Sequence, residues 1–301
     1  MKEREITRAG SFAIVALVYA LAIVVGIACV LVCSYLTQTS VLQGFWWKLL
    51  VADVLATVVT FAFSVAFKNA SVYDPYWSVQ PIVILLATIP LANASLLGVL
   101  AVAVVCLWGV RLTANWAYTF HGLSHQDWRY TKLHDQTGKW YPFVNFFGIH
   151  LVPTLVVYAC TLPAVAVLLY APEFSVFSAV CLAVSVCAVL LQGTADVQMH
   201  KFRKGGRGGF IRTGLWKHSR HPNYLGEILM WWGIGGCAVF AIPFAWYLLG
   251  GAVLNTLLFL CISIPLADGR QSRKEGFSEY KAQTRMLLPI PKRQKKQEVL
   301  N

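Results

Sequence analysis

Apolar runs long enough to cross a lipid bilayer recur along most of this 301-residue chain. A bilayer core is about 30 Å thick, and an α-helix crosses it in about 20 residues. Lipid offers no hydrogen-bond partners, so each run must satisfy its own backbone polar groups as a helix. With 57% hydrophobic and 13% charged residues, the chain is predicted to be an all-α, polytopic membrane protein. Hydropathy predicts about eight spans, at residues 11–35, 46–67, 79–92, 95–117, 143–170, 175–199, 224–244 and 246–266.

The Lys and Arg residues collect on one side of these predicted spans. If the N-terminus is cytoplasmic, all of the 25 Lys and Arg residues except Lys48 fall in cytoplasmic segments. Such an excess is typical of cytoplasmic loops, so an even number of spans with both termini in the cytoplasm is predicted. The third predicted span is short and contains Pro81 and Pro90.

The chain contains no internal repeat and no low-complexity linker, which predicts one integral membrane domain over residues 1–301. The basic tail, residues 291–301, is interpreted as a contact with anionic membrane lipids. The eight cysteines lie within predicted spans without a metal-binding spacing and are interpreted as packing residues. Neither a metal nor a nucleic-acid partner is expected.

Polar side chains mark the cytoplasmic end of the sixth predicted span. Asp196, His200 and Arg203 share one helical face. An acid one or two turns inside a span needs a protein or ligand donor, so Asp196 is a candidate site residue. The following loop interleaves glycines with Arg207 and Arg212, a composition that suits a phosphate group. A cationic loop lying on lipid headgroups explains the same residues.

The segment 214–227 concentrates cations, imidazoles, an amide and a carboxylate at the start of the seventh predicted span. Pro222 suits the first turn of a helix, where its missing N–H costs nothing. The N-terminus of that helix opens toward Arg220 and His221 and favours an anion.

One stripe of this seventh helix carries Asn223, Glu227 and Trp231, which recur every four residues. A ring that bears a carboxamide, such as nicotinamide, fits between the amide and the carboxylate, with the indole beside it. Aromatic packing is the alternative explanation for Trp231. A carboxylate facing lipid is strongly disfavoured, so Glu227 is interpreted as a site residue.

Together with Ala195-Asp196-Val197-Gln198 and Phe277-Ser278-Glu279-Tyr280, this segment resembles the C-terminal domain of the steroid 5α-reductase superfamily, and within it a largely bacterial branch. The resemblance covers about residues 100–290. It implies a cytoplasm-facing cavity that holds NADPH, with residues 100–290 binding the cofactor and residues 1–100 binding an apolar substrate. The cofactor contacts that it implies are Asp196, Arg203, Arg212, Arg220, His221, Asn223, Tyr224, Glu227, Arg273 and Tyr280.

The N-terminal half departs from this pattern. The reductases use a Gln-Glu pair and a Tyr to polarise the substrate carbonyl, and residues 1–120 contain no Gln-Glu pair. Reduction of a C=C bond conjugated to a carbonyl needs a hydride, a proton and a donor to the carbonyl oxygen. Tyr73 or Asp74 is the expected catalytic replacement, although an interfacial aromatic turn explains both residues equally well.

The predicted function is therefore NADPH-dependent reduction of a lipid-soluble substrate with an activated C=C bond, of steroid, polyprenoid or fatty acyl type. The Arg-His-Pro-x-Tyr core also resembles isoprenylcysteine and phospholipid methyltransferases, which bind S-adenosylmethionine. Methyl transfer is the first alternative. A lipid-binding membrane protein without catalytic activity is the second.

Overall fold

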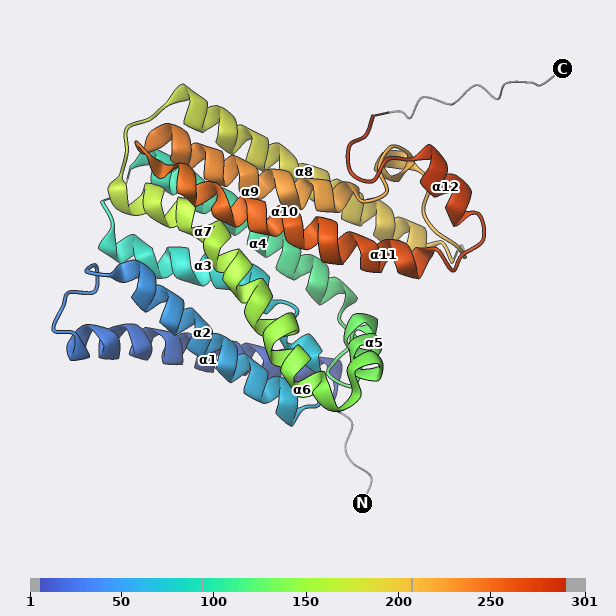
Figure 1. The fold of residues 1–301 in the computed structure, drawn as a ribbon, viewed down its shortest axis with the longest axis horizontal. Coiled ribbons are helices and arrows are strands. Elements are labelled where there is room, and N and C mark those ends of the chain that lie inside the picture. The colour runs from blue at the N-terminus through green and yellow to red at the C-terminus, as the bar shows by residue number, and fades with distance from the viewer. Residues whose placement is uncertain (1–5, 94, 207, 291–301) are drawn as a thin grey trace. The chain divides into compact units, whose positions relative to one another are not determined.

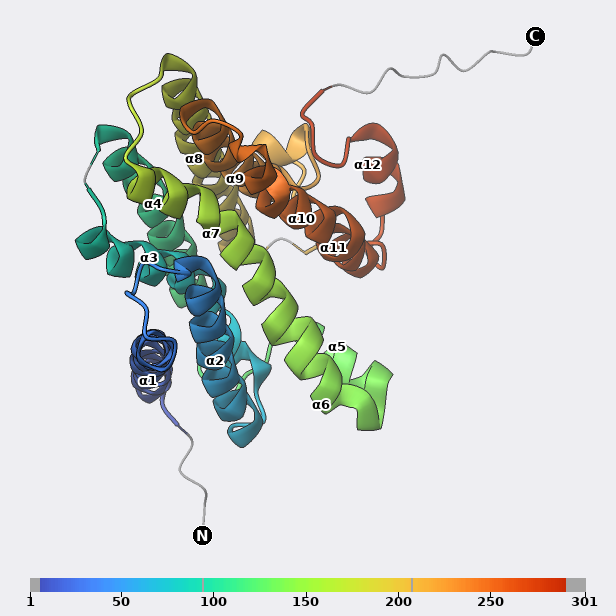
Figure 2. The same cartoon turned by 60° about the vertical axis from the view of Figure 1, so that its left-hand side comes forward.

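The computed structural model describes residues 6–93, 95–206 and 208–290, and the predicted basic tail, 291–301, lies outside these ranges. The chain separates into two compact units, residues 1–173 and 174–301. The division into a substrate part, 1–100, and a cofactor part, 100–290, stays a prediction. Its helices are α1 (Arg8–Leu36), α2 (Phe45–Ala66), α3 (Tyr76–Thr88), α4 (Leu96–Thr119), α5 (Trp128–Thr137), α6 (Tyr141–Val144) and α7 (Val152–Tyr170); unit 2 has α8 (Val176–Lys204), α9 (Pro222–Ala241), α10 (Gly250–Leu258), α11 (Ile264–Gln271) and α12 (Phe277–Gln283) (Figures 1 and 2).

Seven of the described helical segments are long and apolar enough to cross a membrane. The predicted fold class, an all-α polytopic membrane protein, is confirmed. The predicted third span differs, because α3 has only 13 residues and reaches about 20 Å at 1.5 Å per residue. Nevertheless, α3 runs antiparallel to α2 and α4 (Figure 1). The location of both termini in the cytoplasm stays a prediction.

Hydrogen bonds tie three loops together at one end of unit 1. The Leu123 N–H donates to Ser11 Oγ at 3.0 Å, the Asn69 amide donates to Leu123 O at 2.6 Å, and Arg8 donates to Ala117 O at 2.8 Å. We call this region, which comprises residues 8–11, 69–74 and 117–130, the polar end of unit 1. The bonds fix the turn between α2 and α3 against the start of α1.

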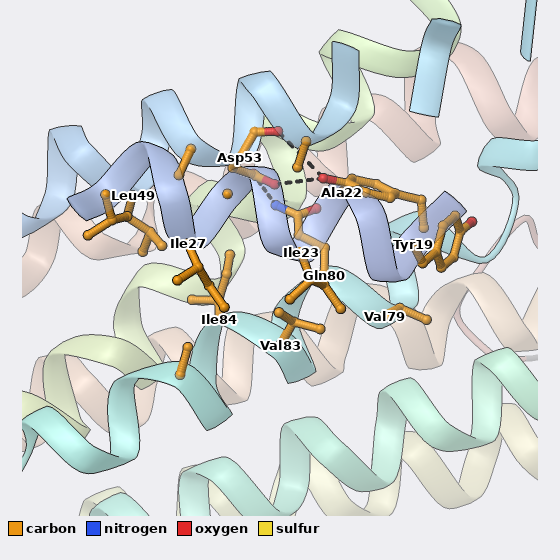
Figure 3. A pocket seen from close by; sticks show the side chains of 16 residues that line it. Tyr19, Ala22, Ile23, Ile27, Leu49, Asp53, Val79, Gln80, Val83 and Ile84 are labelled. Atoms are coloured by element: carbon orange, nitrogen blue, oxygen red, sulfur yellow. Dashed lines mark hydrogen bonds between the residues drawn. The ribbon is translucent and has the colours of Figure 1, made fainter. Parts of the chain in front are cut away.

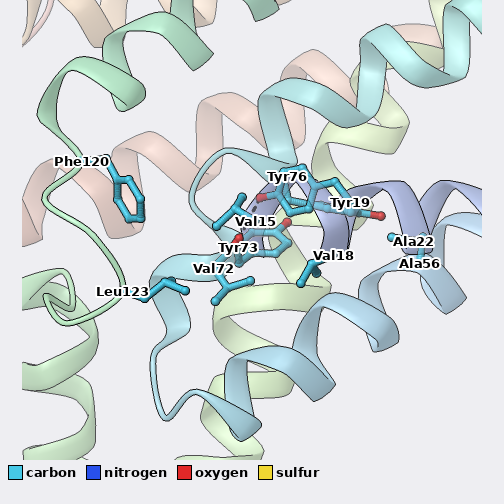
Figure 4. Close-up of a cluster of buried hydrophobic side chains, with 10 residues drawn as sticks. All are labelled: Val15, Val18, Tyr19, Ala22, Ala56, Val72, Tyr73, Tyr76, Phe120 and Leu123. Atoms are coloured by element: carbon cyan, nitrogen blue, oxygen red, sulfur yellow. Dashed lines mark hydrogen bonds between the residues drawn. The ribbon is translucent and has the colours of Figure 1, made fainter. Parts of the chain in front are cut away.

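A core cluster beside the polar end fixes the aromatic residues of that turn (Figure 4). The Tyr19 hydroxyl of α1 donates to Val72 O at 2.7 Å. The Tyr73 and Tyr76 rings stack with centroids 5.3 Å apart. Both rings are buried, so their hydroxyl groups are held in defined positions by packing from several helices.

Lys48, the one basic residue outside the predicted cytoplasmic segments, is fully buried. Its ammonium group donates to Ser34 Oγ at 3.0 Å, Thr39 Oγ1 at 2.9 Å and Ser40 O at 2.7 Å. A lysine has three N–H donors, and all three are used here. Lys48 therefore fastens the loop between α1 and α2 and carries no exposed charge.

Helices α8 and α9 of unit 2 approach each other closely at glycine. A Cβ added at Gly233 would lie 2.6 Å from Cys181 O and would also meet the Ser185 side chain. Ser185 donates to Met230 O at 2.9 Å across the same contact. The side chains in this contact therefore have no room for an extra methyl group.

Replacing Gly233 by Ala is expected to destabilise unit 2 by about 1–3 kcal/mol, because the methyl group meets backbone that cannot move independently. Unfolding of the purified protein in mixed detergent measures this change. Gly250→Ala is the matched control, since an added Cβ there meets nothing within 4 Å. Equal stability of the two variants would contradict the close packing described here.

Candidate functional site

A largely apolar pocket of about 110 Å³ lies within unit 1, between α1, α2 and α3 (Figure 3). Two of its lining residues, Ile27 of α1 and Ala87 of α3, have exposed side chains. Both are apolar and lie on helices whose outer faces are hydrocarbon. The pocket therefore opens between exposed apolar side chains of unit 1 and suits an apolar ligand.

One polar cluster interrupts this apolar lining. Asp53 of α2 is 6% exposed, and its Oδ1 accepts a hydrogen bond from the Tyr76 hydroxyl at 3.1 Å. Its Oδ2 accepts from the amide of Gln80, one turn further along α3. An acid, a phenol and an amide thus meet and bond one another in a hydrocarbon pocket, and Figure 3 shows Asp53 and Gln80 side by side.

The two predicted catalytic residues, Tyr73 and Asp74, are absent from the pocket lining. The Tyr73 hydroxyl bonds Thr154 Oγ1 at 2.9 Å. Asp74 accepts a hydrogen bond from Tyr130 at 2.6 Å and pairs with Arg129 at 3.8 Å. Burial raises the pKa of Asp74 to about 6, although Arg129 and Tyr130 act in the opposite direction. The tyrosine of this motif that does line the pocket is Tyr76, three residues after Tyr73.

The predicted stripe on α9 lies against α8. Glu227 is 4% exposed and accepts a hydrogen bond from Trp231 Nε1 at 2.9 Å, one helical turn away. Asn223 is half-buried, and within the described part of the chain its buried Oδ1 has no hydrogen-bond partner. A Cβ added at Gly226 would lie 2.5 Å from the Gln192 side chain of α8. Gln192 precedes the half-buried Asp196 by one helical turn. The stripe and the acid therefore belong to one helix pair.

Arg220 and His221 are buried against an acid of α11. Arg220 Nη2 lies 3.0 Å from Asp268 Oδ2, and His221 Nε2 lies 2.9 Å from Asp268 Oδ1. Arg220 also donates to Thr284 O at 2.7 Å. These contacts fasten the start of α9 to α11 and to the segment after α12.

Two aromatic residues assigned to the cofactor have protein contacts as well. The Tyr280 hydroxyl donates to Trp216 O, which ties α12 to the loop before α9. The Tyr224 ring stacks on His221 at 5.2 Å and contacts Phe259 at 4.8 Å. Their predicted contacts with a cofactor stay predictions.

Basic side chains gather where α8 and α11 end. Lys274 donates to Gly209 O at 2.6 Å. Partial burial lowers the pKa of Lys274, and the charges of Arg270 and Arg203 lower it further. Arg203 and Arg270 therefore each lie close enough to Lys274 to repel its charge, an arrangement that an anion would stabilise.

Arg212 and Arg273, two more of the predicted cofactor contacts, are exposed. Arg212 donates to Gly276 O at 3.3 Å, and its guanidinium lies 4.3 Å from the centre of the Phe210 ring. Arg273 follows α11. With Arg203, Arg270 and Lys274, these residues form a cationic surface on unit 2, which we call the basic rim.

Sequence reasoning missed Asp53, Gln80 and Asp268. Asp53 and Asp268 are acids inside or at the edge of apolar spans, the same signal that selected Asp196 and Glu227. An ionisable residue in a span marks a functional site or a buried pair. Applied to every such residue, that rule selects Asp53 and Asp268 from the sequence alone.

These features define a multi-pass helical membrane protein with a largely apolar pocket. Residues 60–284 match the family described as protein of unknown function, DUF1295, and the chain belongs to that family. It is also similar to an uncharacterised protein of Schizosaccharomyces pombe, with 27% identity over 215 residues. That match covers 61% of each chain, so the protein spans about three fifths of the length of its curated relative. No solved structure matches the chain.

Proposed function

We propose that this protein is an NADPH-dependent reductase of a lipid-soluble enone or related activated alkene. The observation that carries the proposal is the cluster of Asp53, Tyr76 and Gln80 in an otherwise apolar pocket. The superfamily that the sequence resembles, with which DUF1295 is associated, uses an acid, an amide and a phenol to hold a substrate carbonyl. Here the same three chemical groups come from two different helices.

The size of the pocket favours a chain-like substrate over a fused ring system. A cavity of about 150 Å³ holds one benzene ring, whereas this pocket measures about 110 Å³. It accommodates a carbonyl and a few carbon atoms, while the rest of the molecule extends past Ile27 and Ala87 into the lipid. A polyprenoid or fatty enone fits this geometry better than a steroid nucleus.

Unit 2 supplies the groups that fit the cofactor. The buried Asn223 Oδ1 lacks a partner among the described residues and can accept a hydrogen bond from a carboxamide. Glu227, on the same stripe, offers a second acceptor. The basic rim suits the phosphates of NADPH, with Arg203 and Arg212 as the first choices. We assign this site to the cytoplasmic side, where the basic residues are predicted to lie.

The chemistry follows from the pocket residues. A cofactor held by the unit 2 residues would supply the hydride that reduction of a C=C bond requires. When Asp53 is protonated, it can donate to the Tyr76 oxygen. The Tyr76 O–H, which otherwise bonds Asp53 Oδ1, can then donate to the carbonyl oxygen and stabilise the negative charge that develops there. The proton added to the neighbouring carbon comes from the Tyr76 and Asp53 pair, which must then recover a proton.

Binding of NADPH to the purified protein in lipid nanodiscs tests the proposal without a known substrate. Glu227→Gln is expected to weaken binding by about 10- to 150-fold, because hydrogen bonds to charged groups contribute about 1.5–3 kcal/mol. Glu275→Gln removes the same charge from an exposed position and should bind as the wild type does. The wild-type affinity should fall steeply with salt concentration if the basic rim holds phosphates.

The same titration separates the alternatives. Saturable binding of S-adenosylmethionine without binding of NADPH would replace reduction by methyl transfer. Binding of neither ligand would favour a lipid-binding protein without catalysis. Equal NADPH affinities of wild type and Glu227→Gln would remove Glu227 from the proposed site.

A further inference from the structure

The proposed reaction consumes one proton in each turnover, and the pocket has no evident aqueous supply. Its lining apart from the polar cluster is apolar, and its exposed residues, Ile27 and Ala87, are apolar as well. Asp53 is buried beneath them. A proton that is lost from the pocket must therefore return through the protein.

A row of buried hydroxyl groups leads from Asp53 toward the polar end of unit 1. The Tyr76 hydroxyl donates to Asp53 Oδ1 at 3.1 Å, and Thr57 Oγ1 lies 3.5 Å from the Tyr76 hydroxyl. Thr57 Oγ1 is 3.0 Å from Thr154 Oγ1, which is 2.9 Å from the Tyr73 hydroxyl. Three of these hydroxyl-bearing side chains are at most 2% exposed, and Tyr76 is 6% exposed.

The hydrogen-bonding capacity of each group permits one continuous direction along this row. A hydroxyl donates one hydrogen bond and accepts up to two. Tyr73 can therefore donate to Thr154, Thr154 to Thr57, Thr57 to Tyr76, and Tyr76 to the Asp53 carboxylate. The Thr57 hydroxyl has a second acceptor, Asp53 O at 2.9 Å. The row is complete only when Thr57 turns toward Tyr76, where the 3.5 Å separation must shorten.

Gln80 allows Asp53 to exist with or without a proton. Its amide N–H donates to Oδ2 of the ionised acid. Its Oε1 is buried without a hydrogen-bond partner within the described ranges, and a rotated amide would present this oxygen to a protonated Asp53. The pocket therefore offers a hydrogen-bond partner to both forms of the acid.

We propose that the hydroxyl groups of Tyr73, Thr154, Thr57 and Tyr76 form a proton relay that restores the proton of Asp53 from the polar end of unit 1. Each hydroxyl passes its proton to the next oxygen and receives one from the group behind it. Asp53 gains one proton, and a hydronium ion at the polar end gives one to Tyr73 and is left as water, so the balance is closed. The purpose of the relay rests on the proposed reductase function. Proton exchange along the row of hydroxyl groups does not depend on that function.

His150 lies beside the Tyr73 end of the row and is fully buried. Its ring contacts the Tyr73 ring with centroids 4.7 Å apart, and its Nδ1 lies 2.9 Å from Asn145 O. Its Nε2 is buried without a hydrogen-bond partner in the described part of the chain. A water molecule between this nitrogen and the Tyr73 hydroxyl would have polar partners on both sides.

Infrared spectroscopy in proteoliposomes tests the relay without NADPH or substrate. The carbonyl stretch of a protonated carboxyl group shifts when its proton is exchanged for deuterium. The band of Asp53 is assigned by its loss in Asp53→Asn and by its shift in Tyr76→Phe. After transfer to deuterated buffer, Thr154→Val is expected to slow the exchange of this band at least about tenfold, which corresponds to a barrier higher by about 1.4 kcal/mol.

Two further variants separate proton transfer from packing. Thr161→Val changes another buried threonine of α7, whose hydroxyl bonds only its own helix at Val157 O, and should exchange as the wild type does. Thr154→Ser keeps the hydroxyl and should restore fast exchange. If Thr154→Val does not fold, Tyr73→Phe interrupts the row at its other end and serves the same purpose.

Equal exchange rates in wild type and Thr154→Val would overturn the relay, as would the absence of an Asp53 carboxyl band at every pH. Neither outcome affects the binding of NADPH. Conversely, failure of NADPH to bind would overturn the proposed reduction while leaving the exchange rates unchanged. The two proposals can therefore fail separately.

Discussion

Replacing Tyr76 by Phe is expected to lower the rate of enone reduction by about 10²- to 10³-fold, the loss that follows removal of one donor to a developing oxyanion. The substitution deletes the hydroxyl that lies 3.1 Å from Asp53 Oδ1 and leaves the ring in place. The affinity for NADPH should not change, because the proposed cofactor residues belong to unit 2. The loss should therefore appear in kcat.

Oxidation of NADPH by a long-chain 2-enone in proteoliposomes measures this rate. Tyr158→Phe is the matched control, since Tyr158 is another buried tyrosine of unit 1 whose hydroxyl bonds Trp46 O at 2.6 Å and which does not line the pocket. Its rate should be close to that of the wild type. Retention of the wild-type rate in Tyr76→Phe would remove the phenol from the chemistry, and a faster reaction with a steroid enone would contradict the chain-like substrate.

The fold was largely predictable because the bilayer leaves few choices. Apolar runs of spanning length must be helical, and the described helices follow them closely. The exception is α3, where hydropathy cannot distinguish a short buried helix from a complete span. The helix begins after the turn at Tyr73 and ends where a short 3-10 turn, Ile89–Leu91, follows it. It packs against α4 and α7.

The pocket was not predictable from motifs, because its polar groups are far apart in the sequence. Asp53 and Gln80 are separated by 27 positions and meet only when α2 packs beside α3. A search for adjacent Gln and Glu residues therefore found nothing, although the same chemical groups are present. Tyr73 and Asp74 stay a prediction, and the residue of the same turn that lines the pocket is Tyr76.

The Arg220 and His221 pair illustrates a second limit of sequence reasoning. The residues precede a helix N-terminus, so an anionic ligand was expected there. An acid 47 positions after His221 contacts both side chains, with Asp268 Oδ1 2.9 Å from His221 Nε2, and the anionic ligand stays a prediction. The sequence contains Asp268, but it does not show that α11 packs so that this acid contacts Arg220 and His221.

Replacing Asp268 by Ala is expected to destabilise unit 2 by about 3–5 kcal/mol, because it leaves a buried guanidinium without its counter-ion. Arg220 and Asp268 have side chains that are only 7% and 10% exposed, so water cannot substitute for the lost carboxylate. Arg220 keeps its bond to Thr284 O, which favours the lower end of this range. The start of α9 loses its attachment to α11, so NADPH binding should weaken as well.

Lys281→Ala provides the control for this loss. Lys281 Nζ lies 3.6 Å from the same carboxylate, but its side chain is 54% exposed, and exposed ion pairs contribute at most about 1 kcal/mol. Detergent-induced unfolding of the two variants measures the difference directly. If Asp268→Ala lost no more unfolding free energy than Lys281→Ala, Arg220 would have to reach solvent in the folded protein. The buried network would then not be what holds the start of α9.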